Sequence, residues 1–188
     1  DKTLGLLIFL LIIPLLCIIA FALFVTSGRP IIFKQKRLGW DGRAFTIYKF
    51  RTMKPHKERE NKITQATIDD QRFTLIGKWL RKSSFDELPQ IINVLQGRMS
   101  LVGPRPHVAQ HDNEYQKTIQ GYVRRYSVKP GITGWAQVND LRGEIRSTDD
   151  INRRLQHDLF YIENWSLWFD LRIILPTIIK VFISRQAW

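Results

Sequence analysis

Two adjacent carboxylates offer the most specific chemistry in this chain. Asp86 and Glu87 follow a basic pair, Arg81 and Lys82, at the predicted start of a short helix over residues 88–95. The partial positive charge at a helix N-terminus favours ionised acids and bound anions. An ionised Asp can attack phosphorus, and a carboxylate pair can anchor Mg²⁺ when substrate phosphates complete its octahedron. The pair is therefore a candidate site for phosphate chemistry.

A structural role for the same pair stays open. Residues 84–87 (SFDE) fit the capping-box pattern, in which Glu87 only caps the helix that follows. With Ser84 as the cap, Pro89 would lie past the first turn, where proline disrupts the backbone hydrogen bonds. With Asp86 as the cap, Pro89 lies within the first turn and is tolerated. The residues alone therefore leave catalysis and capping as alternatives.

Isolated basic residues in constrained segments form the second set of candidates. Arginine suits bidentate recognition of phosphate, and the proline on each side of Arg105 restricts its backbone. The alternative for any one of these residues is a solvated position at the surface. The candidates are Lys49 and Arg51 in YKFRTM, Arg105 in GPRP, and Arg142 after GWAQVND.

Two histidines and a tryptophan carry weaker signals. His107 and His111 are four residues apart, as zinc ligands on a helix are, but no Glu follows His107 in the HExxH manner and no third ligand is evident. Trp135 has a ring that can stack on a nucleobase, although packing in a core or at an interface is commoner. The sequences GxxxxGK[ST], GxGxxG and GxSxG are absent, which argues against P-loop, nicotinamide and α/β-hydrolase enzymes.

A long apolar segment, residues 4–25, indicates where such a site must work. Its 22 residues (LGLLIFLLIIPLLCIIAFALFV) contain no charge, and as a helix they cover roughly 33 Å, enough to cross a hydrocarbon core of about 30 Å. A signal peptide is the competing interpretation, but its apolar region is usually shorter and ends in a small-residue cleavage site, which is not evident here. Pro14 should kink or break the helix, which then either spans the bilayer or turns back to the side it entered.

The composition fits one basic domain beside this membrane segment. The chain has 188 residues, and 29 Lys and Arg against 17 Asp and Glu give a formal net charge of +12. This excess favours anionic partners such as nucleic acid, acidic phospholipid or phosphorylated small molecules. The bilayer segment argues against nucleic acid, and a basic lipid-binding module without chemistry remains an alternative. The basic residues after the apolar segment, in particular Arg29 and Lys34, predict a cytoplasmic flank.

The remaining pattern predicts an α+β fold that is mainly helical. Turn-rich loops are expected at 102–106 and 129–134, and Gly97 should end the helix over 88–95. The Trp-rich stretch 165–188 is expected to lie amphipathically in the headgroup interface, with a core-packing helix pair as the alternative. The other expected elements are short strands at 31–33 and 45–48 around a turn at 39–42, a polar loop at 54–70, and helices at 72–82, 112–126 and 149–164.

In their order along the chain, these segments resemble the bacterial monotopic phosphoglycosyl transferases. The matching pieces are IFKQKRLG, YKFRTM, DELPQIINVLQGRMSLVGPRP and KPGITGWAQVN, which together cover essentially the whole chain. TQAT at 64–67, GPRPH ending at His107 and RGE at 142–144 are most similar to the C-terminal catalytic region of the undecaprenyl-phosphate glucose phosphotransferases. In that branch the region follows several transmembrane helices and another domain, so a start at Asp1 is expected of a fragment.

The resemblance implies that a sugar 1-phosphate moves from a UDP-sugar to undecaprenyl phosphate, with release of UMP. Glucose is the expected sugar, and galactose or an amino sugar is the alternative. Asp86 is then the nucleophile, which forms a phosphosugar–aspartyl intermediate, Glu87 is its partner, and both bind Mg²⁺. The implied substrate-binding residues are Lys49, Arg51, Arg81, Arg105, Gln137 and Arg142.

The resemblance also implies an architecture. Residues 1–28 would form a re-entrant membrane helix broken at Pro14, and residues 29–188 one catalytic domain on the cytoplasmic face of the bacterial inner membrane. Phospholipids of that membrane are expected partners, a homodimer is compatible with the family, and nucleic acid is not expected. Ile13 stands where the family often has Ser before the proline, and Arg98 stands where an acidic residue commonly follows glycine. Neither departure touches the carboxylate pair.

Overall fold

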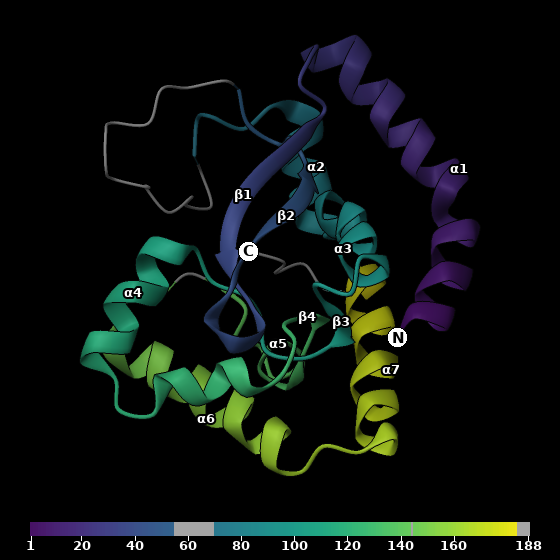
Figure 1. Ribbon diagram of the computed structural model, residues 1–188. Coiled ribbons are helices and arrows are strands. Elements are labelled where there is room, and N and C mark those ends of the chain that lie inside the picture. Colours follow the sequence, from purple (N-terminus) through teal and green to yellow (C-terminus); the bar gives the residue numbers. More distant parts are fainter. Residues whose placement is uncertain (55–69, 144, 184–188) are drawn as a thin grey trace.

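The computed structural model describes residues 1–54, 70–143 and 145–183, with side chains up to residue 180. It confirms a mainly helical α+β fold, in which a long N-terminal helix runs along one side of a hairpin and a group of helices (Figure 1). Most of the predicted polar loop at 54–70, the TQAT segment at 64–67, Glu144 and the end of the Trp-rich stretch lie outside the described residues.

Helix α1 (Lys2–Ser27) contains the predicted apolar segment. It continues through Pro14 as one helix that curves along the domain (Figure 1), so the predicted break at Pro14 is wrong. A proline removes one backbone hydrogen bond, and bending relieves the clash of its ring with the preceding turn. Both halves of α1 also pack on the domain, around Ile8 in one core cluster and Ile19 in the next, which stabilises the continuous helix.

Both ends of α1 are held by the polar domain. Near its start, Gly5 packs so closely on α3 (Ile91–Leu95) that a Cβ there would lie 3.2 Å from the Val94 side chain. At its end, the buried Arg51 guanidinium donates hydrogen bonds to the carbonyls of residues 27–29. These carbonyls would otherwise lack partners at the helix terminus. The helix therefore lies against the domain along its length.

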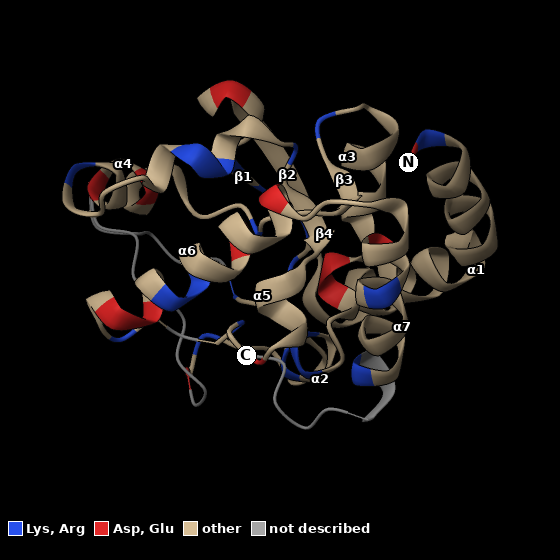
Figure 2. Cartoon of the chain, turned by 90° about the horizontal axis from the view of Figure 1, so that it is seen from below, with Lys and Arg blue, Asp and Glu red and all other residues tan. Residues whose placement is uncertain are grey.

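The outer face of α1 is exposed and apolar. Only 11% of its most apolar stretch is buried, and the helix is long and apolar enough to cross a membrane. Figure 2 shows almost no charge along it. A core helix of a soluble protein would bury most of such a surface. The exposed large side chains are Leu4, Leu6, Leu7, Leu10, Leu11, Ile18, Phe21, Phe24 and Val25.

The predicted hairpin is present and longer than expected. Strands β1 (Ile32–Leu38) and β2 (Ala44–Phe50) pair antiparallel, and the short helix η1 (Trp40–Gly42) forms the turn between them. Side chains alternate across a strand, so Phe45, Ile47 and Lys49 share the inner face of β2. The hairpin thereby points a lysine toward the interior.

Helix α2 (Leu75–Ser83) and the two short helices after it carry the carboxylate pair. Thr74 caps α2 by accepting a hydrogen bond from Gly77, which explains why the helix begins later than the predicted 72. The predicted helix over 88–95 is divided into a 3₁₀ helix, η2 (Phe85–Gln90), and α3. Gly97 ends this region with a φ of 74°, as predicted.

A short parallel strand pair joins the two turn-rich loops. Strands β3 (Ser100–Val102) and β4 (Gly131–Thr133) were not predicted, because three residues beside glycines and prolines show no alternation. The backbones touch here: a Cβ on Gly131 would lie 2.1 Å from the amide nitrogen of Gly103. Only glycine permits this approach. The strand pair fixes the GPRP loop against the KPGITG loop.

Helices α4 (Ala109–Thr118), α6 (Thr148–Glu163) and α7 (Leu167–Ile183) complete the domain. The predicted helix over 112–126 is interrupted at Gly121, whose φ is 78°, and resumes as the 3₁₀ helix η3 (Tyr122–Ser127). Helix α6 agrees with the prediction.

Helix α7 is amphipathic, as predicted. Ile173 is fully buried in a cluster with Val102 and Tyr161, whereas Trp168 is 77% exposed. One face therefore packs on the core, as the alternative interpretation expected, and the opposite face is free for an interface.

Candidate active site

Glu87 is the centre of a buried ion cluster. Lys49 Nζ lies 2.8 Å from Oε1, and Arg105 contacts both oxygens, with Nη2 2.6 Å from Oε1 and Nη1 3.0 Å from Oε2. Arg142 Nη2 lies 3.1 Å from Oε2. Each Glu87 oxygen thus contacts two cationic nitrogens, which uses the roughly four acceptor positions of a carboxylate.

This geometry excludes the capping role for Glu87. Ser84 has a left-handed backbone (φ 61°), and its Oγ accepts a hydrogen bond of 2.6 Å from Arg142 Nη1 instead of capping the turn. Asp86 is not the cap either, because the turn already begins at Phe85. The carboxylate pair therefore lies inside a 3₁₀ turn, and the Glu87 side chain is directed to the ion cluster.

Four separate segments supply the cluster. Lys49 comes from the inner face of β2, Glu87 from η2, Arg105 from the loop after β3, and Arg142 from the loop after α5 (Trp135–Val138). The hairpin packs on η2, and the β3–β4 pair fixes the Arg105 loop. Predicted site residues that lie far apart in the sequence are thus brought onto one carboxylate.

Asp86 has a different environment from its neighbour. It is only 4% exposed, and no described residue donates a hydrogen bond to it. Burial and then the adjacent Glu87 carboxylate raise the pKa of Asp86, against Lys49, Arg81 and Arg142.

Burial alone would also raise the pKa of Glu87, but Arg105, Lys49 and Arg142 together hold it well below its ordinary value. The expectation that a helix terminus keeps both acids ionised therefore fits Glu87 better than Asp86. Burial outweighs the weak dipole of a short 3₁₀ turn at Asp86.

Arg81 supplies a cation that has no partner of opposite charge among the described residues. Its guanidinium lies 4.9 Å from the centre of the Phe73 ring, and no described carboxylate lies within ion-pair distance of it. Asp86 and Glu87 are near enough to affect its pKa, which burial lowers. Arg81 is therefore placed near the carboxylates, and within the described residues its charge is available to bind an anion.

The residues fit Mg²⁺ through Asp86 rather than through both acids. Among the described residues there is no group of three or more His, Cys, Asp and Glu side chains that could hold a metal. A magnesium ion bound here would rely on one carboxylate and on substrate phosphates, which is common for this ion. Within the described residues the oxygens of Asp86 have no hydrogen-bond donor, whereas those of Glu87 are occupied by cations. Joint binding by Glu87 would require a cation to leave.

Two predicted substrate ligands lie elsewhere. Arg51 holds the end of α1, as described above. Gln137 lies in α5 and donates a hydrogen bond of 3.2 Å to the carbonyl of Ile132. No described contact joins either side chain to Asp86 or Glu87, so their predicted roles in substrate binding have no support from this geometry.

The weaker candidates have structural roles. His107 is buried and hydrogen-bonded to Tyr122, while His111 is 3.9 Å from Glu114, so the two histidines do not form a metal pair within the described chain. Trp135 packs edge-on against Phe169, with ring centres 5.1 Å apart, and this agrees with the packing role.

The sequence patterns missed two arginines that support the site. Arg125 and Arg37 donate hydrogen bonds to the main-chain carbonyls of Arg105 and Pro106. No motif marks them, because Arg125 falls in the predicted helix over 112–126 and Arg37 is one of several basic residues that follow the apolar segment. Their contacts depend on tertiary structure, which local periodicity does not show.

Residues 1–184 match the family model described as bacterial sugar transferase. The chain belongs to the bacterial sugar transferase family. All 188 residues align at 49% identity with the UDP-glucose:undecaprenyl-phosphate glucose-1-phosphate transferase of Escherichia coli (strain K12), and they cover 40% of that protein. The resemblance inferred from the motifs is confirmed at the level of the family.

Two further relatives of this sugar transferase differ in length and in named sugar. The protein of Caulobacter vibrioides with the same name as the Escherichia coli relative is 42% identical over the whole chain, which covers 70% of it. The UDP-N-acetylgalactosamine-undecaprenyl-phosphate N-acetylgalactosaminephosphotransferase of Aeromonas hydrophila is 42% identical over 174 residues, which are 93% of this chain and 40% of the relative. The chain thus spans about two fifths of the length of the first relative, and the family includes more than one named sugar.

Proposed function

We propose that this chain transfers a sugar 1-phosphate from a UDP-sugar to undecaprenyl phosphate and releases UMP. The main support for the proposal is the difference between the surroundings of the two carboxylates. Glu87 is saturated by three cationic side chains, whereas the oxygens of the neighbouring Asp86 have no hydrogen-bond donor in the part of the chain that the structure describes. The names of the relatives support the same donor and acceptor classes.

The first step is an attack by Asp86 on the donor. A carboxylate oxygen of Asp86 forms a bond to the phosphorus that carries the sugar, and the bond from this phosphorus to the oxygen of UMP breaks. UMP leaves with the electron pair, and the sugar phosphate stays on Asp86. Lys49, Arg81 and Arg142 offset the repulsion between the carboxylate and the pyrophosphate, and they stabilise the departing charge.

The second step returns Asp86 to its carboxylate form. A phosphate oxygen of undecaprenyl phosphate attacks the same phosphorus, and the bond to Asp86 breaks. A magnesium ion bound to Asp86 and the substrate phosphates would neutralise charge on the transferred group. Arg105 does not need to contact the reacting atoms, because both Nη atoms of its guanidinium already donate hydrogen bonds to Glu87.

Helix α1 supports a position at the membrane. Both ends of this helix are held by the domain that carries Asp86, and its outer face is apolar. We propose that α1 and the exposed face of α7 lie in the lipid of a bacterial inner membrane, with the site on the cytoplasmic side. The phosphate of the acceptor lies at headgroup level, and this arrangement brings it to the site.

The proposal is tested by UMP release. The chain in detergent or nanodiscs should release UMP from UDP-glucose and Mg²⁺ in a stoichiometric burst without acceptor, and turn over when undecaprenyl phosphate is added. UDP-galactose and UDP-N-acetylgalactosamine, run in parallel, identify the preferred sugar. No UMP from any of these donors would contradict the proposed activity.

The reaction should slow as the pH rises through about 8. Burial lowers the pKa of Lys49 to about 8, against the opposing effect of Glu87. Below this pH the ammonium group is charged and offsets the phosphate charge, and above it the charge is lost. The burst rate without lipid acceptor, measured between pH 7 and 9.5, should therefore decline.

Lys49→Arg should keep its rate to higher pH, because an arginine stays protonated to above about pH 12. Lys36→Arg, on the exposed side of the same hairpin, should follow the wild-type profile. A flat wild-type profile would show that Lys49 does not act through its charge.

A further inference from the structure

The loop that carries Arg105 lacks backbone donors at two positions. Pro104 and Pro106 have no N–H group, so beyond the β3–β4 pair the loop cannot donate backbone hydrogen bonds at these two positions. Its three successive carbonyls are nevertheless all occupied. The carbonyl of Pro104 accepts from the Gly131 amide at 3.0 Å, that of Arg105 from Arg125 Nη2 at 2.7 Å, and that of Pro106 from Arg37 Nη1 at 3.1 Å.

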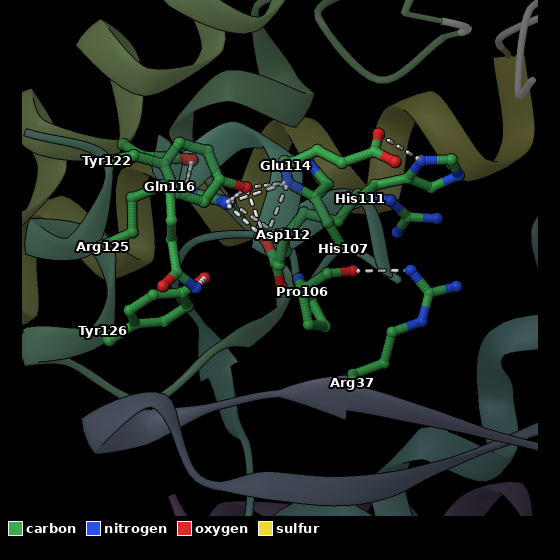
Figure 3. Close-up of polar contacts among 12 residues, drawn as sticks. Arg37, Pro106, His107, His111, Asp112, Glu114, Gln116, Tyr122, Arg125 and Tyr126 are labelled. Carbon is green, nitrogen blue, oxygen red and sulfur yellow. Dashed lines mark hydrogen bonds and ion pairs between the residues drawn. The ribbon is translucent and has the colours of Figure 1, made fainter. Parts of the chain in front are cut away.

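Arg125 is itself held at every nitrogen of its guanidinium. Its Nε donates to Asp158 Oδ2 at 2.8 Å, and its Nη1 donates to Tyr122 Oη at 2.7 Å and lies 2.9 Å from His107 Nδ1. The residue is only 5% exposed. Figure 3 shows Arg125, Tyr122, His107 and Asp112 converging behind the Pro106 loop. The third arm, Nη2, is thereby aimed at the Arg105 carbonyl.

Most contacts in this network can be assigned a donor and an acceptor. Burial and then the Arg125 guanidinium lower the pKa of His107 to about 3, so its ring is neutral and Nδ1 can accept from Arg125. Tyr122 Oη donates to Asp112 Oδ1 at 2.5 Å. In this arrangement Arg125 Nη1 donates to His107 Nδ1 and to Tyr122 Oη, and Tyr122 Oη donates to Asp112, whereas the 2.6 Å contact between His107 Nδ1 and Tyr122 Oη brings two acceptors together.

Arg37 links the same loop to the hairpin. Its Nη2 donates to Gln35 Oε1 at 2.6 Å, and its Nη1 reaches Pro106 (Figure 3). Both Arg37 and Gln35 lie on β1, whose partner β2 carries Lys49. The two cations that contact Glu87 Oε1, Lys49 and Arg105, are therefore fixed relative to each other through Arg37.

We propose that Arg125 and Arg37 are positioning residues for the transfer reaction. They hold the main chain at Arg105 and Pro106, so that the Arg105 guanidinium contacts Glu87. The inference rests on the proposed function, because it is measured on that reaction. Neither residue contacts Asp86 or Glu87 in the described chain. Each acts through the carbonyl that it holds, and Glu87 in turn fixes Lys49 and Arg142 beside the nucleophile.

The expected effect is on the rate of the chemical step. A misplacement of about 1 Å at a catalytic group can cost up to about 100-fold in rate. Lysine cannot donate in three fixed directions as a guanidinium does. We therefore expect Arg125→Lys to lower the burst rate about 10- to 100-fold, with a much smaller change in the UDP-sugar concentration that gives half-maximal rate. Arg37→Lys should act in the same direction.

Arg124→Lys is the matched control. Arg124 is the adjacent residue, is exposed, and pairs at 2.7 Å with Glu163 at the surface, so this variant should keep wild-type rates. Tyr122→Phe is the milder test if Arg125→Lys does not fold. It keeps the buried ring and removes only the hydroxyl that holds Nη1, and it should also lower the rate with little change in half-saturation.

A double-mutant cycle separates positioning from general damage. If Arg125 acts only through Arg105, then Arg125→Lys or Tyr122→Phe should cause little further loss in an Arg105→Ala background. A loss that multiplies with that of Arg105→Ala would overturn the inference, as would wild-type burst rates in both Tyr122→Phe and a folded Arg125→Lys. A wild-type chain that releases no UMP would instead overturn the proposed function itself.

Discussion

Replacing Asp86 with Asn is expected to lower UMP release by roughly 10⁴-fold or more, both with and without the lipid acceptor. An amide has nearly the shape of a carboxylate but does not attack phosphorus, so both the burst and the turnover should disappear. The measurement is UMP produced from UDP-glucose and Mg²⁺ by equal amounts of wild-type and variant protein. Binding of the donor should persist, because the cations around Glu87 are unchanged.

Asp41→Asn is the matched control for this experiment. Asp41 lies in the exposed hairpin turn with a φ of 57°, a conformation that asparagine adopts readily, so the variant should keep wild-type activity. If Asp86→Asn retained full turnover, Asp86 would not be the nucleophile, and the proposed two-step mechanism would have to be abandoned.

Replacing Glu87 with Gln should affect both activity and stability. The carboxylate is the common partner of Lys49, Arg105 and Arg142, whose side chains are 14%, 25% and 22% exposed. Removing one partner of a buried ion cluster leaves charges without compensation and costs about 3–5 kcal/mol. We expect a loss of about 3 kcal/mol in the free energy of unfolding, because these side chains keep some solvent. The burst rate should fall about 10³-fold as the cations move apart.

Glu163→Gln makes the same chemical change in an exposed ion pair. Glu163 contacts Arg124 at the surface, with side chains 54% and 58% exposed, so its loss should cost at most about 1 kcal/mol. Thermal unfolding of the two variants in the same detergent compares the sites directly. Equal stability of Glu87→Gln and Glu163→Gln would show that the cation cluster does not depend on Glu87.

The sequence was sufficient to predict site residues whose chemistry depends on their neighbours in the chain. The adjacency of Asp86 and Glu87 and the proline-flanked Arg105 were visible in the sequence, and the structure brings Glu87 and Arg105 into contact. Helical periodicity also located α6, whose capping box at Ser147 confirms its start. Lys49 could be assigned to a strand, but its burial against Glu87 required the packing of the hairpin on η2.

Other features depend on tertiary contacts that local patterns do not record. Pro14 carries a strong local signal for a break, and packing of both halves of α1 on the domain overrides it. Arg51 has the composition of a phosphate ligand, yet the unpaired carbonyls at the end of α1 use its guanidinium. The β3–β4 pair is too short for any periodicity. The role of Arg125 could not be predicted either, because it consists entirely of contacts between segments that are far apart in the sequence.

The mass of the protein during the first half-reaction tests the proposed two-step mechanism most directly. Wild-type chain is incubated with UDP-glucose and Mg²⁺ without acceptor, quenched in acid, and analysed by intact-mass and peptide mass spectrometry. We predict a gain of one hexose phosphate on the peptide that contains Asp86, its absence in Asp86→Asn, and its disappearance when undecaprenyl phosphate is added. A full burst of UMP without any covalent adduct, or an adduct on another residue, would contradict the proposed mechanism.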